Sequence, residues 1–178
     1  AEGGTAIDAI AAPERFRVIL LELGTECLAV HAPDAPNVLG FARFRLGDDP
    51  ASPLVELVRQ DATAREAIEA ARTFIGASGL EVALCRDFPG RIIDRLIRPY
   101  FNSVLQRLDE GLATAADLDL TVRLGLGYPV GPVTLLGRSG LAQHFDISQA
   151  LFEAYGERAL VPARRAQVAH ERRRRGKD

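Results

Sequence analysis

The sequence contains no methionine among its 178 residues, and therefore no initiator residue. This absence favours a piece of a longer polypeptide. No apolar run approaches the roughly 18 residues that a membrane-spanning helix needs, and the N-terminus lacks the features of a signal peptide. We therefore expect a soluble, cytoplasmic protein with no membrane partner.

Cysteine is also scarce in this chain. Cys27 and Cys85 lie far apart, and neither has a C-x-x-C partner or a histidine at metal-ligand spacing. This pattern favours two buried intracellular thiols over a disulfide or a metal site. No metal is expected.

The chain has no large excess of charge of one sign, because its formal net charge is −2. Such a balance argues against a nucleic-acid or anionic-membrane partner. The one basic run lies at the C-terminus and includes Arg172 to Arg175. No aromatic residues interleave these arginines, so we expect a solvated, mobile tail over residues 164–178, not a site for nucleic acid or CoA phosphates.

Short apolar runs organise the first 86 residues. Residues 16–23 are mostly apolar, with Arg17 and Glu22 near the two ends, and Gly24 follows them, which is typical of a strand buried on both faces. Further strands are predicted over residues 37–45, 54–58 and 80–85, and a helix over residues 62–75. Strands on either side of a helix predict a βαβ unit in a parallel or mixed sheet.

From residue 87 onward the apolar residues recur at helical spacing. A long helix is predicted over residues 92–108, bent at Pro99. Thr114 suits the N-cap of a helix over residues 115–124, Pro132 suits the start of the next, and a last helix covers residues 140–155. The sequence thus predicts an α/β domain over residues 1–86 and an all-α domain over residues 87–163.

Three motifs in the second half have fixed spacings. They are PGRIIDRLIRP from Pro89, EGLATAADLD from Glu110 and RLGLGYPVGP from Arg123. Together they resemble the C-terminal helical domain of the 3-hydroxyacyl-CoA dehydrogenases, in which these runs read roughly P-G-F-x-x-N-R-L-x-x-P, E-G-x-A-x-x-x-D-I-D and R-L-G-x-x-x-P-x-G-P. The resemblance covers about the last half of the chain. It implies that the first 86 residues are a reduced Rossmann-like domain.

The resemblance also implies a reaction and the residues that would perform it. The family oxidises a 3-hydroxyl by giving its proton to a histidine, held by a glutamate, while hydride passes to NAD. The histidine position is Ala42 here, the glutamate position is Glu56, and the active-site asparagine position is Asp94. The family's serine has no clear counterpart around residues 25–27.

The cofactor fingerprint is missing as well. A Rossmann fold that binds NAD has G-x-G-x-x-G after its first strand, and this chain has no such motif. We therefore expect no NAD in this chain, only in a parent enzyme, and no catalysis. An active enzyme of altered chemistry, with Asp94 or Glu56 as base, is the less favoured reading.

The pattern resembles one branch of the family, the long enzymes that include those acting on 3-hydroxyadipyl-CoA in phenylacetate breakdown. In that branch a second, shrunken Rossmann-like domain precedes a second helical domain, and the implied role is structural. The expected partner is the N-terminal catalytic half of the same polypeptide or a second copy in a homodimer. The predicted contact surface is an apolar stripe on the long helix: Ile93, Leu96, Ile97, Tyr100 and Val104. A stand-alone acyl-CoA-binding module is the alternative.

Cys27, His31 and Asp34 could be drawn as a nucleophile and base set. They lie in and beside the proline-rich run HAPDAP, and no helix N-terminus or strand-turn elbow activates the thiol. A surface loop is the favoured interpretation.

Three further residues have a structural and a functional interpretation. His144 follows the helical pattern beside Phe145 and is expected to be a partly buried structural residue. His170 stands alone in the predicted tail. Tyr128 anchors a Gly-Tyr-Pro turn, although it could instead line an acyl-CoA cleft.

Overall fold

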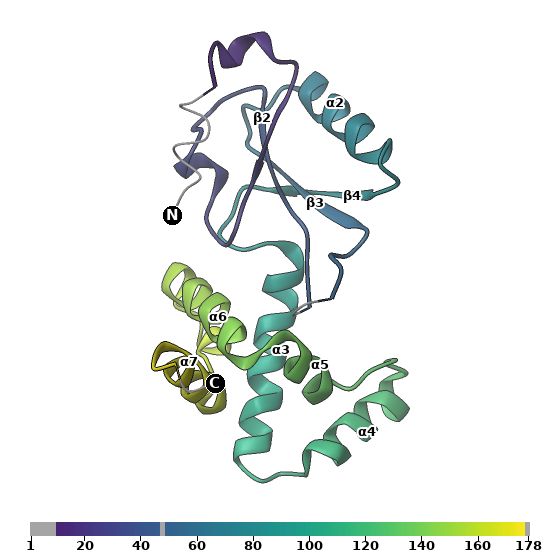
Figure 1. Ribbon diagram of the computed structural model, residues 1–178, viewed down its shortest axis with the longest axis vertical. Helices are drawn as coiled ribbons and strands as arrows, with labels where there is room; N and C mark the ends of the chain where they lie inside the picture. Colours follow the sequence, from purple (N-terminus) through teal and green to yellow (C-terminus); the bar gives the residue numbers. More distant parts are fainter. Residues whose placement is uncertain (1–9, 47–48, 177–178) are drawn as a thin grey trace. The chain divides into compact units, whose positions relative to one another are not determined.

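The computed structural model describes residues 10–46 and 49–176. The chain divides into two compact units (Figure 1). Unit 1 comprises Ala1–Phe44 and Ala51–Ile92, and unit 2 comprises Arg45–Pro50 and Ile93–Asp178. Along the sequence the division falls within the first residues of a helix, six residues beyond the predicted boundary at residue 86.

The described residues of unit 1 form a four-stranded mixed sheet with one α-helix. The strands lie in the order β1 (Ile19–Glu22), β2 (Val38–Ala42), β3 (Leu54–Arg59) and β4 (Glu81–Arg86). The β1–β2 and β3–β4 pairs are parallel and the β2–β3 pair is antiparallel. Helix α2 (Arg65–Gly76) connects β3 to β4, as the βαβ pattern predicts. Two 3-10 turns, η1 (Pro13–Arg15) and η2 (Leu28–Val30), flank β1.

Both faces of this sheet are covered by apolar side chains. Helix α2 packs Ala67, Ala71 and Ile75 against one face, and Figure 1 shows this helix next to the sheet. The segment that includes η2 covers the other face with Leu28 and Ala32. The predicted surface loop is therefore partly core, because Leu28, the first residue of the 3-10 turn, and Ala32, just beyond it, are buried against the sheet.

Unit 2 contains five α-helices in its described part. They are α3 (Ile92–Asp109), whose first residue lies in unit 1, α4 (Ala115–Leu126), α5 (Pro132–Ser139), α6 (Leu141–Tyr155) and α7 (Arg164–Arg174), with a 3-10 turn η3 (Arg158–Leu160) before α7. Thr114 caps α4 by accepting a hydrogen bond from the Asp117 N–H at 3.2 Å, as expected. Helix α3 continues through Pro99. The core joins Phe101 and Leu105 of α3 to residues of α5, α6 and α7.

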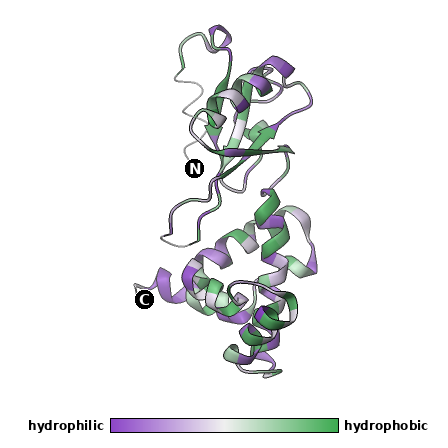
Figure 2. Ribbon diagram, turned by 90° about the vertical axis from the view of Figure 1, so that its right-hand side faces the viewer, coloured by the Kyte–Doolittle hydropathy of each residue, from purple (hydrophilic) through white to green (hydrophobic). Residues whose placement is uncertain are grey.

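The predicted mobile tail is instead helical over most of its length. Helix α7 packs on α6 with Ala166 fully buried, although it is drawn mainly in the hydrophilic colour in Figure 2. Asp146 of α6 accepts hydrogen bonds from Arg173 at 2.6 Å and lies 2.8 Å from the His170 ring, which stacks on Phe145. These partners lie more than twenty residues away in sequence, so the local pattern could not show them.

The described residues include no helix with the length and apolar character required for crossing a membrane.

Candidate functional site

Strands β2 and β3 bring together the two positions that the resemblance assigns to the catalytic pair. Their antiparallel register places Ala42 directly opposite Glu56. Side chains opposite one another in such a pair have Cβ atoms about 4.5–5.5 Å apart. The backbone therefore retains the geometry for a base and its supporting carboxylate, but the side chain of Ala42 is a methyl group that accepts no proton.

Glu56 is buried, with 2% of its surface exposed. Its Oε2 accepts a hydrogen bond from the Ile92 N–H at 2.9 Å, at the first residue of α3. The first N–H groups of a helix have no partner within the helix, and a carboxylate there satisfies one of them and complements the helix dipole. Glu56 therefore caps the start of α3.

Asp94 lies in the first turn of α3 and is held by a cation four residues further on. The Nε and Nη2 atoms of Arg98 each lie 2.8 Å from Asp94 Oδ1. Arg98 is 3% exposed and the Asp94 side chain 19%. A charged, paired carboxylate thus stands where the family has a neutral amide.

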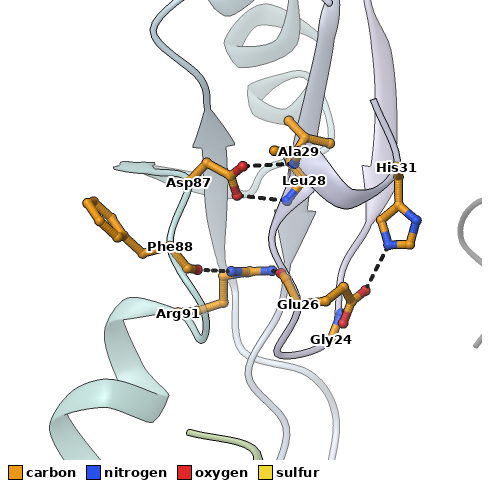
Figure 3. Close-up of polar contacts among 8 residues, drawn as sticks. All are labelled: Gly24, Glu26, Leu28, Ala29, His31, Asp87, Phe88 and Arg91. Carbon is orange, nitrogen blue, oxygen red and sulfur yellow. Dashed lines mark hydrogen bonds and ion pairs between the residues drawn. The ribbon is translucent and has the colours of Figure 1, made fainter. Parts of the chain in front are cut away.

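The segment around residues 25–27 is fastened to the turn that precedes α3. The Gly90 N–H donates to the Thr25 carbonyl at 2.7 Å. Arg91 is 3% exposed and donates to the carbonyls of Glu26, Phe88 and Gly90 (Figure 3). The buried guanidinium of Arg91, bonded to backbone oxygens, therefore lies beside residues 25–27, where the resemblance would place the family's serine.

Asp87, the residue that follows β4, also binds this region. Its two carboxylate oxygens accept hydrogen bonds from the Leu28 N–H at 2.7 Å and the Ala29 N–H at 2.8 Å (Figure 3). These are the free N–H groups at the start of η2. The donors that follow β1 are consequently occupied by an internal anion.

Glu26 and His31 form a further pair in this region, with Glu26 Oε1 3.5 Å from His31 Nε2 (Figure 3). Burial raises the pKa of Glu26, but backbone N–H groups, including that of Gly24, and the His31 ring outweigh it, so that the pKa of Glu26 is lowered. The pair holds the β1–η2 turn in place.

The Cys27, His31 and Asp34 set is not assembled. His31 faces Glu26, while the Asp34 N–H donates to the side chain of Gln60 at 2.9 Å. Burial, followed by the charge of Asp87, raises the pKa of the Cys27 thiol, which disfavours the thiolate nucleophile. Burial also raises the pKa of Cys85. Within residues 10–46 and 49–176, no cluster of histidine, cysteine and acidic side chains could hold a metal.

A cavity of about 240 Å³ lies at the carboxyl ends of the parallel strands β3 and β4. Ligands of open α/β sheets bind at such an edge. Arg59 and Arg86 there share one counter-ion, Asp61, at 3.6 and 3.1 Å. The lining residues are Asp34, Arg59, Gln60, Asp61, Arg86, Asp87 and Phe88. This lining of three aspartates and two arginines offers no paired nucleophile and base.

The motifs that carry the family resemblance have an architectural role in the structure. Asp119 of α4 accepts hydrogen bonds from the backbone N–H groups of Val133 and Thr134 at 2.7 and 3.0 Å and so caps α5. A Cβ at Gly131 would lie 2.2 Å from the Asp119 carboxyl carbon. The spacing between the acidic motif and the Gly-Pro pair therefore fixes how α4 meets α5. Tyr128, in the turn between them, is 45% exposed.

Sequence reasoning did not detect the polar chain that crosses unit 2. His144 is fully buried, not partly buried as expected, and its Nε2 lies 2.9 Å from Asn102 Oδ1. Its Nδ1 lies 3.3 Å from Arg98 Nη1. The i,i+4 spacing of Asp94 and Arg98 was the one local signal of this chain of contacts.

Residues 90–177 match the family described as 3-hydroxyacyl-CoA dehydrogenase, C-terminal domain. The chain is 34% identical over 113 residues to a 3-hydroxybutyryl-CoA dehydrogenase of Bradyrhizobium diazoefficiens, over 64% of this chain and 39% of that protein. The chain spans less than half the length of the curated relatives that it matches.

Solved structures resemble a larger part of the chain. The FadB2 structure of Mycobacterium tuberculosis has a TM-score of 0.81 and 27% identity, and the similarity covers 94% of this chain and 59% of that chain. The 3-hydroxybutyryl-CoA dehydrogenase structure of Escherichia coli K12 has a TM-score of 0.71 and 30% identity, over 84% of this chain and 32% of that chain. These similarities extend the match from the helical residues into unit 1.

Proposed function

Residues 90–177 of this chain belong to the 3-hydroxyacyl-CoA dehydrogenase C-terminal domain family, and from that membership we propose that the chain is a non-catalytic, structural part of an NAD-dependent 3-hydroxyacyl-CoA dehydrogenase. The parent enzyme oxidises a 3-hydroxyacyl-CoA to a 3-oxoacyl-CoA in fatty-acid or phenylacetate breakdown. Unit 1 corresponds to the reduced Rossmann-like domain and unit 2 to the helical domain.

The observation that carries this proposal is the pair formed by Ala42 and Glu56. Oxidation of the hydroxyl needs a base that takes the O–H proton while the C–H bond yields its hydride. The residue opposite Glu56 has no such group. Glu56 itself is buried and bonded to the first turn of α3, so it is held in a structural contact and is not presented to a substrate.

The residues of unit 1 do not fit an NAD pyrophosphate. A dinucleotide needs a glycine-rich turn that leads from a strand into a helix N-terminus with free N–H donors. After β1, the free donors of η2 bond Asp87, whose negative charge opposes a phosphate. The connection from β3 to α2, over residues 60–64, contains no glycine. We therefore assign the cofactor to another part of the parent enzyme.

A structural part needs a surface for its partner, and we propose that this surface lies on α4 and not on the predicted stripe of α3. Of the predicted stripe, Val104 is buried, and Ile97 and Tyr100 pack against the core of unit 2. Only Leu96, at 71% exposure, is one of its large exposed residues.

Helix α4, by contrast, buries none of its side chains. Its neighbourhood exposes five large apolar residues: Leu112, Leu120, Leu124, Leu126 and Tyr128. Isolated helices of about 12 residues are marginal in water, so such a helix gains stability by being covered. We assign this surface to a second copy of the chain in a homodimer, and name it the α4 surface.

An activity assay tests the proposed function. The purified chain is incubated with NAD and a 3-hydroxyacyl-CoA, and NADH formation is followed by absorbance, with an active 3-hydroxybutyryl-CoA dehydrogenase as positive control. We expect the rate to equal that of the reaction without protein. Turnover above that rate contradicts the proposal. Calorimetric titration with the acyl-CoA alone checks the alternative, since saturable binding without turnover supports an acyl-CoA-binding module.

A further inference from the structure

His144 on α6 is fully buried, and each of its two ring nitrogens has a polar partner. Its Nδ1 lies 3.3 Å from Arg98 Nη1, and its Nε2 lies 2.9 Å from Asn102 Oδ1. The ring of Phe101 packs against it edge to face, at a centroid distance of 5.8 Å. The imidazole therefore has neither solvent nor a second partner for either nitrogen.

These contacts fix where the imidazole proton resides. A guanidinium only donates hydrogen bonds, so His144 Nδ1 must be the unprotonated acceptor. The proton is then on Nε2 and is donated to Asn102 Oδ1. The Asn102 amide nitrogen in turn donates to the Ala159 carbonyl at 3.1 Å. Each group thus donates a hydrogen bond to the next, from Arg98 to His144, from His144 to Asn102, and from Asn102 to the Ala159 carbonyl of η3.

This chain of hydrogen bonds joins three elements of unit 2. Arg98 and Asn102 are one turn apart on α3, His144 is on α6, and Ala159 is in η3, the turn that leads into α7. Arg98 is anchored in addition by Asp94. We name Arg98, His144, Asn102 and the Ala159 carbonyl the His144 latch.

We propose that the His144 latch is acid-sensitive: a proton taken up at Nδ1 turns the acceptor for Arg98 into a second donor facing it, and the contact of α6 with α3 is lost. Protonation also places two cations side by side in the protein interior. Buried like charges are costly because no water screens them. Unit 2 thus loses stability in mild acid because the folded state disfavours protonation of His144 Nδ1.

The direction of the pKa agrees with this geometry. Burial, followed by the positive charge of Arg98, lowers the pKa of His144 from 6.5 to about 3. An unfolded chain takes up this proton near pH 6.5, whereas the folded chain takes it up only near pH 3. The stabilising contribution of neutral His144 is therefore complete above pH 6.5 and is lost as the pH falls from 6.5 toward 3.

The charged side chains of α3 and α7 that lie nearest α6 have partners of their own. From α3, Arg98 faces the ring with Asp94 behind it, and Arg95 lies over the Tyr155 ring. From α7, His170 and Arg173 bind Asp146 on α6. His170 is the other histidine in contact with α6, through Asp146 and Phe145, and it serves as the matched control.

The test compares urea unfolding of the full chain at pH 7, 6 and 5 for wild type, His144→Gln and His170→Gln. A glutamine oxygen can accept from Arg98 and its amide can donate to Asn102, without titrating. We expect the unfolding constant of wild type, relative to His144→Gln, to rise by up to about tenfold for each pH unit below 6. His170→Gln should keep the steep dependence of wild type below pH 6. Equal pH dependence of wild type and His144→Gln overturns the proposal.

A second measurement does not depend on how the glutamine variant folds. Nitrogen-15 NMR of the wild-type histidine rings should show His144 as one neutral tautomer, protonated on Nε2, from pH 7 to pH 5. A proton on Nδ1, or titration of the folded protein near pH 6.5, overturns the proposal. Neither test uses NAD or acyl-CoA, so the outcome is independent of the proposed function.

Discussion

Ala42 lies directly opposite Glu56 in the antiparallel pair of β2 and β3. The carboxylate of Glu56 is buried, but the side chain opposite it, which a catalytic carboxylate would orient, is the methyl group of Ala42. Glu56 has a structural contact instead, because its Oε2 accepts a hydrogen bond from the Ile92 N–H at the start of α3. A position that the resemblance assigns to catalysis therefore stabilises the fold.

The stability of unit 1 tests this reassignment of Glu56. The substitution Glu56→Ala leaves the Ile92 N–H without its acceptor, and an unsatisfied buried donor costs about 1–3 kcal/mol. We expect the free energy of unfolding in urea to fall by that amount. Glu81→Ala, at an exposed position at the start of β4, is the control and should change it by less than about 0.5 kcal/mol. Equal stability of Glu56→Ala and wild type contradicts the capping role.

A second prediction concerns the missing base. The variant Ala42→His should show no dehydrogenase activity when NAD and a 3-hydroxyacyl-CoA are supplied, because a cofactor site is lacking in addition to the base. The double variant Ala42→His, Asp94→Asn should be equally inactive. Measurable turnover in either variant shows that the argument from the cofactor site is wrong.

Packing at Gly40 provides a third prediction. A Cβ at this position would lie 2.2 Å from Leu23 Cδ1 and 3.2 Å from Val58 Cβ. Gly40→Ala therefore overpacks the sheet and should destabilise the protein by about 1–3 kcal/mol. Gly76→Ala is the matched control, because a Cβ there meets nothing within 4 Å, and it should leave stability unchanged or raise it by about 0.5 kcal/mol. Thermal unfolding of both variants that ranks them in the opposite order refutes this packing argument.

The α4 surface leads to a fourth prediction. Wild type should self-associate in sedimentation experiments, and Leu124→Lys should raise the dissociation constant at least about tenfold, because the cation meets an apolar partner surface. Leu124 is 76% exposed and Leu96 is 71% exposed. Leu96→Lys is therefore a matched control, and it should associate like wild type. A single 19.3 kDa species for wild type at high micromolar concentration contradicts the assignment of a second copy to this surface.

Elements whose signals are local could be predicted from the sequence. The four strands and the helices of residues 62–155 lie within a few residues of their predicted bounds, because glycine, proline and the apolar spacing mark their ends. Thr114 and Pro132 occupy the predicted helix-start positions for the same reason.

Long-range pairs could not be predicted in this way. Helix α7 looked like a solvated tail because its counter-ions, Asp109 and Asp146, belong to other helices. The burial of Arg91 and of His144 depends on carbonyl and amide groups from distant segments. The α4 surface was missed because helical spacing shows that an apolar face exists, but does not show which side of the helix the fold covers.

The most direct test of the central claim is calorimetric titration of the intact chain with NADH, with an NAD-dependent dehydrogenase of known affinity as positive control. The proposed function predicts no saturable heat, because no glycine-rich turn leads into a helix within the described residues of unit 1 and Asp87 occupies the donors of η2. Saturable binding with a micromolar dissociation constant contradicts it.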